Sequence, residues 1–179
     1  MPCPSVFHTV TASCKKAPQR CKCGYFGNPK RECRCSPREV ENYRNRISGP
    51  LLDRIDIHVE APAVEFKELS SDERAEPSGA IRQRVVAARE IQSARFKGGR
   101  TRANAGMSHA QLKTHCKLDP ASQEMLRMAM SELQLSARAY DRILKVSRTI
   151  ADLAESPAIR TEHLAEAIQY RTLDRNLWR

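Results

Sequence analysis

The chain has 179 residues, 40% of them hydrophobic and 5% aromatic, which is enough apolar material for one core built mainly from aliphatic side chains. Its formal net charge of +10, from 31 basic and 21 acidic residues, favours a polyanionic partner such as nucleic acid, although solubility alone also explains such an excess. No apolar run approaches the ~20 residues that span a bilayer, and residues 1–10 lack the features of a signal peptide, so the sequence excludes a membrane protein and indicates a cytoplasmic one.

The N-terminal part of the chain consists of an irregular segment and a cysteine-bearing loop. Residues 1–20 show no clear period and receive no role. The loop that follows contains Gly24 and Gly27 as turn formers. Its cysteines have the spacing C-x-C-x9-C-x-C and are Cys21, Cys23, Cys33 and Cys35.

These four cysteines are candidate ligands of a structural zinc ion. In a cytoplasmic protein, cysteines are more often thiols or metal ligands than disulfides, and four thiolates suit tetrahedral zinc. The spacing within each pair is shorter than the ~2–4 residues usual in such sites, so the glycine turns must help the sulfur atoms to converge. The alternative is four reduced thiols in a surface loop.

The loop lies in a strongly basic window. Residues 15–46 contain ten basic and three acidic residues, a net charge of +7. Cationic neighbours favour the thiolate form of the cysteines, and they are also our candidates for contacts with DNA phosphates. Within the loop these cations are Lys22, Lys30, Arg31 and Arg34.

A helix and a strand are predicted after the loop. The helix covers residues 37–47, because Ser36 and Glu39 have the spacing of a capping box and proline occupies the first helical position. Apolar and polar residues alternate over 55–59, which predicts a half-buried strand. A single strand cannot make a sheet, so its partners must lie outside this chain.

The rest of the chain is predicted to be helical. Residues 63–79 are acidic and rich in turn formers, which is typical of a connector. From residue 80 onward, apolar residues recur at helical spacing and predict a bundle of about five helices. The predicted N-caps of its last four helices are Ser108, Asp119, Ser136 and Thr161.

Four stretches of the chain resemble one known family. They are CKCGYFGNP (residues 21–29), CRCSP (33–37), RISGPLLDRID (46–56) and LSARAYDRILKVSRTIADL (135–153). Long and in a fixed order, they are similar to the Mg-chelatase-like AAA+ ATPases of the ComM/YifB type, over about residues 21–174. The resemblance implies a mainly α fold: the end of an α/β AAA+ core over residues 21–62, then an all-helical lid over 80–179.

The same resemblance implies a function. Such proteins form a homo-oligomeric ring, expected to be a hexamer, that uses ATP and Mg²⁺ to drive work on DNA. In the ComM type this work is branch migration, a helicase-like activity, during natural transformation. Nothing in the sequence favours chelation of a porphyrin.

Three arginines match functional positions of the family. Arg54 resembles the arginine finger, which reaches across a subunit interface towards the γ-phosphate; the alternative is an ordinary arginine paired with Asp53 or Asp56. Arg138 resembles the sensor-2 arginine of the lid, and Arg142, one turn later, is the weaker candidate. The alternative for both is a solvated arginine on an amphipathic helix.

The chain also departs from the family pattern. It has no G-x-x-x-x-G-K-[ST] loop for phosphates and no acidic strand end for magnesium, and Gln19-Arg20 replaces the family's Asn-Pro. We therefore expect that an N-terminal ATPase half is missing and that this chain alone neither binds nor hydrolyses ATP. The rival hypothesis is a stand-alone module, a zinc loop plus helical bundle, that binds nucleic acid without ATPase activity.

Overall fold

The computed structural model describes residues 21–27, 31–46, 54–59 and 76–171. The chain divides into two compact units, residues 1–48 and 49–179, and each is described by itself. The predicted N-terminal segment, most of the predicted connector over 63–79 and the side chain of Lys30 lie outside the described residues.

The first unit contains the cysteine loop and helix α1 (Pro37–Arg44). The predicted capping box is confirmed: the Glu39 backbone N–H donates to Ser36 Oγ at 3.4 Å, and the Ser36 N–H donates to Glu39 Oε2 at 2.9 Å. The helix ends at Arg44, earlier than the predicted residue 47. Val40 is the buried apolar residue of this helix.

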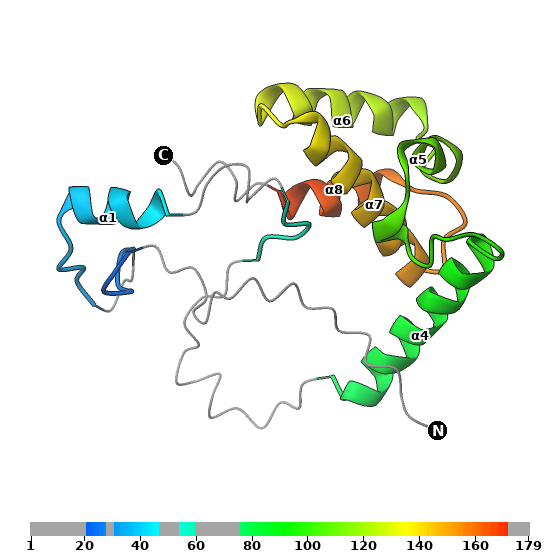
Figure 1. The fold of residues 1–179 in the computed structure, drawn as a ribbon, viewed down its shortest axis with the longest axis horizontal. Coiled ribbons are helices and arrows are strands. Elements are labelled where there is room, and N and C mark those ends of the chain that lie inside the picture. The colour runs from blue at the N-terminus through cyan, green and yellow to red at the C-terminus, as the bar shows by residue number, and fades with distance from the viewer. Residues whose placement is uncertain (1–20, 28–30, 47–53, 60–75, 172–179) are drawn as a thin grey trace. The chain divides into compact units, whose positions relative to one another are not determined.

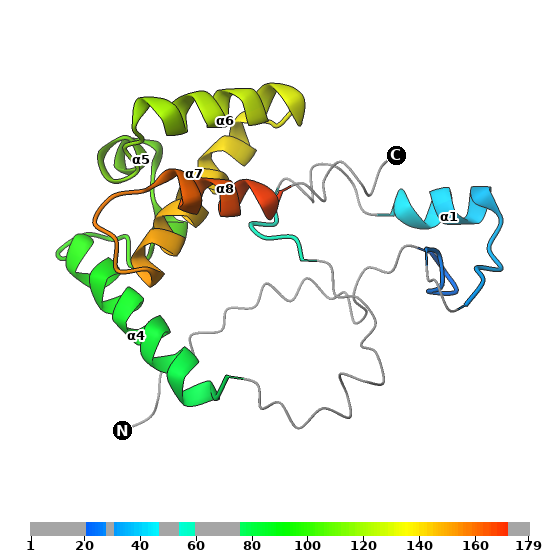
Figure 2. The same ribbon diagram turned by 180° about the vertical axis from the view of Figure 1, so that it is seen from behind.

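The second unit is a bundle of helices, so the predicted mainly α fold is confirmed (Figures 1 and 2). In chain order its elements are α4 (Ser78–Arg95), the 3₁₀ helix η1 (Asn104–Gly106), α5 (His109–His115), α6 (Pro120–Glu132), α7 (Ala137–Leu153) and α8 (Thr161–Gln169). None of the helices in the described ranges combines the length and apolar character needed to cross a membrane.

The helix starts follow the predicted caps in all but one case. Ser108, Asp119 and Ser136 each accept a hydrogen bond from a backbone N–H of the first turn. Helix α8 is capped differently: its N-cap is Arg160, whose N–H donates to His163 Nδ1 at 3.1 Å. The hydroxyl of Thr161 instead forms a hydrogen bond of 3.1 Å with that of Ser122, which ties α8 to α6.

Helix α7 lies at the centre of the bundle. It packs against α4, η1, α5 and α8, and α6 packs against α8. Ile143 of α7 and Leu164 of α8 are fully buried, and each contributes about 1.5–3 kcal/mol through removal of its side chain from water. The core also contains Phe96, Met107, Leu112, Leu126, Leu144 and Ile159.

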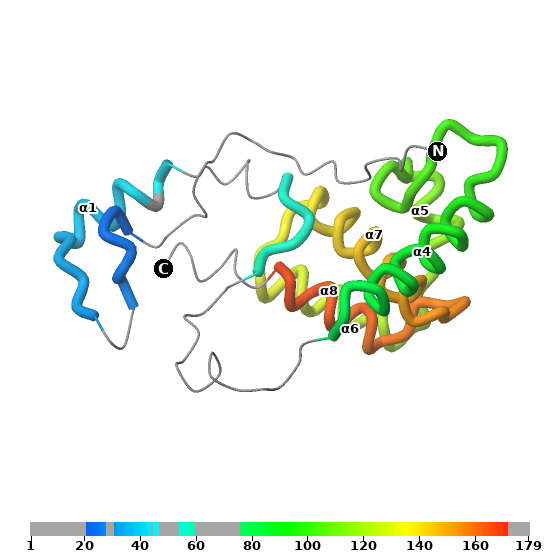
Figure 3. Tube along the Cα trace, turned by 90° about the horizontal axis from the view of Figure 1, so that it is seen from below, coloured from blue at the N-terminus to red at the C-terminus, as the bar shows by residue number. Residues whose placement is uncertain are grey.

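The predicted strand over residues 55–59 is wrong. These residues form no strand but run beside the bundle, with the His58 N–H donating to the Tyr170 carbonyl at 3.0 Å (Figure 3). Ile57 and Val59 are 47% and 73% exposed, whereas the ring nitrogens of His58 are buried. The physical reason is that a strand forms only with a neighbour to complete its ladder, and no described segment supplies one.

Candidate functional site

The segment 54–59 begins with Arg54 and is fixed to α7, the helix that carries Arg138 and Arg142. The carboxylate of Asp56 forms an ion pair with the guanidinium of Arg142 in α7. The guanidinium of Arg171, a side chain buried to 1% exposure just after α8, donates to the Ile55 carbonyl. Together with the hydrogen bond from His58, these contacts hold the segment against α7 and the end of α8.

Arg54 directly precedes this fixed segment and is exposed to solvent. Of the two acids considered as ordinary partners, Asp56 pairs with Arg142, and Asp53 lies outside the described residues. An exposed arginine whose backbone is fixed on one side can reach an anionic group of a neighbouring molecule.

The structure separates the two candidates on α7. Arg138 lies in the first turn, where Ser136 Oγ accepts the Ala139 N–H at 3.2 Å, and it is exposed. Within the described ranges it takes part in no ion pair. The N-terminus of a helix favours anions through its unpaired N–H groups and dipole. Arg142, in contrast, holds the segment 54–59 through Asp56, so Arg138 is the better candidate for contact with a phosphate.

The structure brings the four predicted metal ligands together. The sulfur atoms of Cys21, Cys23, Cys33 and Cys35 all lie within 4.8 Å of one another. The sulfur of Cys23 lies 3.3 Å from that of Cys21 and 3.6 Å from that of Cys33, and the Cys33 and Cys21 sulfurs are 3.7 Å apart. No cysteine in the described residues is disulfide-bonded. Four thiols so placed can hold one metal ion.

Two glycine turns allow each close-spaced pair to converge. Gly24 and Gly27 have φ angles of +83° and +79°, which only glycine adopts readily. The Gly24 N–H donates to the Cys21 carbonyl at 3.1 Å and so closes the first turn. The Phe26 N–H then points at the Cys21 sulfur, 3.3 Å away.

The thiols of Cys23 and Cys33 differ in acidity. Hydrogen bonds from the backbone N–H groups of Tyr25 and Arg34 lower the pKa of Cys23 to about 6. The pKa of Cys33 is raised to about 12, because burial and the neighbouring thiols of Cys23 and Cys21 outweigh the N–H of Cys35, which lowers it. Cys23 therefore ionises more readily than Cys33.

Basic residues belong to the same loop as this cluster. Lys22 and Arg34 are exposed within the loop. Arg31 donates from Nη1 to the hydroxyl of Tyr25 at 2.8 Å, and its guanidinium lies 5.3 Å from the centre of the same ring. The loop therefore presents positive charge next to its cysteines.

A buried polar network in the bundle was not predicted from the sequence. Asp152 in α7, whose side chain is 0% exposed, accepts hydrogen bonds from Arg95 at 2.5 and 2.7 Å, from Asn104 at 2.8 Å and from Arg148 at 3.0 Å. Burial raises the pKa of Asp152, but the hydrogen bonds from Arg95 and Asn104 and the charge of Arg148 outweigh it and hold the pKa below its ordinary value. The carboxylate thus joins α4, η1 and α7.

Arg148 extends the network to the next loop. Its guanidinium donates to the Ser156 carbonyl at 2.6 Å and to the Pro157 carbonyl at 2.9 Å. A sequence signal existed: Arg148 and Asp152 are four residues apart on α7, beside its apolar stripe. The network is a structural element of the bundle, because its hydrogen bonds join its own side chains and the carbonyls of Ser156 and Pro157.

Cys116 is a buried core thiol. It is 5% exposed, its sulfur lies 3.7 Å from the Leu144 carbonyl, and burial raises its pKa to about 11. It is therefore neither a metal ligand nor an activated nucleophile.

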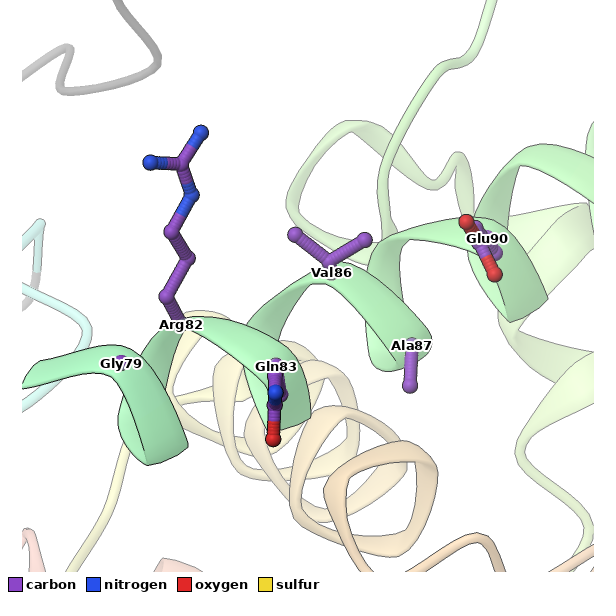
Figure 4. Close-up of a pocket in the computed structure, with 6 residues that line it drawn as sticks. All are labelled: Gly79, Arg82, Gln83, Val86, Ala87 and Glu90. Carbon is purple, nitrogen blue, oxygen red and sulfur yellow. The ribbon is translucent and has the colours of Figure 1, made fainter.

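A shallow hollow on the surface of α4 does not form an enclosed ligand site. The side chains of Arg82 and Val86 project to one side of the helix, and those of Gln83 and Ala87 to the other (Figure 4). All of its lining residues belong to this one helix: Gly79, Arg82, Gln83, Val86, Ala87 and Glu90. Ligand sites are usually concave and built from several elements.

Comparison with known proteins assigns both parts of the chain. Residues 75–171 match the family model described as magnesium chelatase, subunit ChlI C-terminal, and residues 4–69 match the model described as magnesium chelatase, subunit ChlI. The second match begins well before residue 21, so the similarity extends further towards the N-terminus than the quoted motifs indicated. The gap between the two matches falls in the predicted connector.

Several curated proteins are similar to the chain. Competence protein ComM of Haemophilus influenzae is 42% identical over 145 residues, which cover 80% of this chain and 28% of ComM. The uncharacterized protein YifB of Escherichia coli is 40% identical over 154 residues, 86% of this chain and 29% of YifB. The uncharacterized protein Rv2897c of Mycobacterium tuberculosis is 32% identical over 140 residues. The chain spans less than a third of the length of these relatives.

Proposed function

Because the chain belongs to the magnesium chelatase ChlI family and carries its C-terminal domain, we propose that it acts as the C-terminal portion of a ring-forming AAA+ ATPase in the cytoplasm that works on DNA. In this proposal, an N-terminal half that is absent from this chain binds ATP and Mg²⁺. The chain contributes Arg54 to the nucleotide of the next subunit and Arg138 to the nucleotide of its own subunit, in a ring that we take to be a hexamer.

One observation carries the proposal. The segment that follows Arg54 is anchored on α7 through Asp56 and Arg142, and the same helix presents Arg138 one turn earlier. Movement of the lid would therefore move both cations together. Electrostatic stabilisation of a transferring phosphoryl group depends on such positioned cations rather than on covalent chemistry.

The role of Arg138 can be tested in a full-length subunit. The test requires a chimera in which this chain replaces the matching segment of a full-length relative such as ComM. Replacement of Arg138 by alanine is expected to raise the Kd for ATP by roughly 10- to 100-fold, because a charge-assisted hydrogen bond contributes about 1.5–3 kcal/mol. The measurement is titration with a fluorescent ATP analogue.

The matched control is Arg127→Ala, which removes an exposed arginine that pairs with Glu124 on α6. This control should leave the Kd for ATP unchanged. If Arg138→Ala binds ATP as tightly as the control does, Arg138 is the solvated arginine of the alternative interpretation.

Work on DNA is proposed from the family resemblance and from the basic loop of the first unit. The name of one relative, a competence protein, is consistent with it. Lys22, Arg31 and Arg34 are the described cations of this loop, and Lys30 is the fourth candidate. Cations of this kind contact backbone phosphates and carry little sequence preference.

The expected signature is a strong dependence on salt. The logarithm of the DNA affinity should fall linearly with the logarithm of the salt concentration, and Lys22→Ala should reduce the slope by about 0.9 on duplex DNA or about 0.7 on single strands. Fluorescence anisotropy at several salt concentrations measures this, with Arg127→Ala as the control of equal charge. An unchanged slope for Lys22→Ala would remove Lys22 from the DNA interface.

The second candidate function is the stand-alone nucleic-acid-binding module, which the same basic loop favours. The two candidates differ in what a full-length subunit does. If the chimera hydrolyses ATP without any contribution from Arg54 or Arg138 while this chain alone binds DNA, the module is the better description.

A further inference from the structure

We propose that Cys21, Cys23, Cys33 and Cys35 form a closed tetrathiolate site for one structural zinc ion, which holds the basic loop of the first unit in its folded form. This site is independent of the proposed ATPase function.

The sulfur positions fit a single tetrahedral ion. A zinc–sulfur bond of about 2.3 Å places the four sulfurs of a tetrahedral site about 3.8 Å apart. The measured sulfur–sulfur distances of 3.3, 3.6 and 3.7 Å are close to this value, and all four sulfurs lie within 4.8 Å of one another. They are too far apart for disulfide bonds, which need about 2.05 Å. They are also too close together to surround an iron–sulfur cluster, whose ligands attach to several metal atoms.

The ligands all come from the protein, which indicates a structural rather than a catalytic ion. A catalytic zinc keeps one coordination position for water or substrate, whereas four thiolates fill all of them. Cys21 is 0% exposed, and the other three cysteines are partly buried. The site is therefore shielded on the side of Cys21 and has an entry path for the ion on the other.

The backbone around the cluster stabilises thiolates. The Phe26 N–H donates to the Cys21 sulfur at 3.3 Å, and such second contacts orient and stabilise metal ligands. The turn at Gly24 makes this contact possible, since the Gly24 N–H closes on the Cys21 carbonyl. On the other side, Cys35 is followed at once by Ser36, the N-cap of α1, so the ion would tie the loop to the start of this helix.

The positive charge of the loop also favours a tetrathiolate site. Four thiolates with one zinc ion carry a net negative charge, and nearby cations stabilise this charge and oppose protonation of the thiolates. Lys22, Arg31 and Arg34 supply positive charge next to the cluster. The bound ion would in turn keep these cations in one arrangement on a loop that has little apolar core of its own.

The experiment is metal analysis of the whole chain, purified in a reducing buffer and dialysed against a weak chelator. We expect about one zinc per chain by inductively coupled plasma mass spectrometry. Replacement of zinc by Co²⁺ should produce the intense visible bands of tetrahedral cobalt bound to thiolates. The paired variant Cys33→Ser/Cys35→Ser should lose at least nine-tenths of the zinc and both spectral features.

The other three cysteines provide the controls. Cys3→Ser/Cys14→Ser and Cys116→Ala should each retain about one zinc per chain and the cobalt spectrum. Circular dichroism checks folding, because α1 is a small share of the helical residues and the bundle of the second unit does not depend on the loop cysteines. Loss of zinc with the helical signal intact is the expected result for the Cys33→Ser/Cys35→Ser variant.

Three results would overturn the proposal. The first is a zinc content far below one per chain together with no thiolate-to-cobalt band in the unaltered protein. The second is equal zinc in the unaltered protein and in Cys33→Ser/Cys35→Ser. The third is a mass spectrum that shows disulfide bonds among the four cysteines, or iron in place of zinc, in the protein as purified.

Discussion

Replacing Arg54 with alanine is expected to lower the kcat of ATP hydrolysis in the assembled full-length ring by about 10³-fold or more. An arginine supplied across a subunit interface stabilises the charge that develops on the transferring phosphoryl group, and this contribution is about 10³–10⁵ in rate. The KM for ATP should change little, since the interaction is made in the transition state. Steady-state hydrolysis by the chimeric subunit measures both quantities.

Two further variants make this prediction specific. Arg54→Lys keeps the charge but lacks the planar fork of the guanidinium, so it should recover only a small part of the rate. Arg127→Ala, the exposed arginine of α6, should hydrolyse ATP at the unaltered rate. If Arg54→Ala is as active as Arg127→Ala, then Arg54 is an ordinary surface arginine.

Replacing Asp152 with alanine is expected to destabilise the helical bundle by about 3–5 kcal/mol. The substitution leaves Arg148 and Arg95 without their shared carboxylate, and removal of one partner of a buried ion pair costs about this much. Unfolding in urea, followed by circular dichroism, measures the free energy. Asp141→Ala is the matched control on the same helix, because that carboxylate is 37% exposed and pairs with His109 at 3.5 Å.

The control should lie within about 0.5 kcal/mol of the unaltered protein, as is usual at exposed positions. A loss of less than about 1 kcal/mol in Asp152→Ala would contradict the network as a source of stability. The location of Asp152 is also relevant to function, because the network joins α4, η1 and the loop at Pro157 to the helix that carries Arg138.

The same carboxylate predicts how stability depends on pH. The folded-state pKa of Asp152 lies below its unfolded value, so its contribution is fully present above about pH 4 and is lost as the pH falls through the folded-state pKa. Asp152→Asn removes this titration. The difference in unfolding free energy between the unaltered protein and Asp152→Asn should therefore shrink as the pH falls below about 4.

Most of the helices could be predicted because their signals are local. A capping residue and the backbone N–H that it accepts are three residues apart, as at Ser36, Ser108 and Ser136, so the sequence alone contains both partners. The prediction was wrong at α8, whose N-cap is Arg160 and not Thr161. Thr161 has the chemistry of a cap, but its hydroxyl bonds to Ser122 of α6, and this partner is known only from the packing.

The strand over 55–59 failed for the opposite reason. Its alternating pattern is a local signal, but a strand needs a neighbour to pair with, and the described segment instead contacts Arg171 and Tyr170 at the end of the bundle. The alternation of apolar and polar residues is visible in the sequence, but the presence or absence of a pairing strand is not.

The candidate sites also differ in whether their residues are close together in the sequence or meet only in the fold. Spacing and composition were enough to predict the four cysteines as one cluster, because they lie within a single short loop. The Asp152 network escaped prediction, because Arg95, Asn104 and Arg148 come from separate elements and meet only in the folded bundle. Likewise, the resemblance ranked Arg138 above Arg142, but the ion pair that occupies Arg142 involves Asp56, which is distant in sequence.

The central claim is that Arg54 of one subunit serves the nucleotide bound by the next. The most direct test is ATP hydrolysis by mixed rings of two inactive chimeric subunits. One carries Arg54→Ala with an intact phosphate-binding loop, and the other carries Arg54 with that loop disabled. We predict that mixing restores a substantial part of the hydrolysis rate, because the second subunit offers its arginine to the ATP of the first. Hydrolysis that stays at the level of the separate inactive subunits, although mixed rings are seen by native mass spectrometry, would contradict the account.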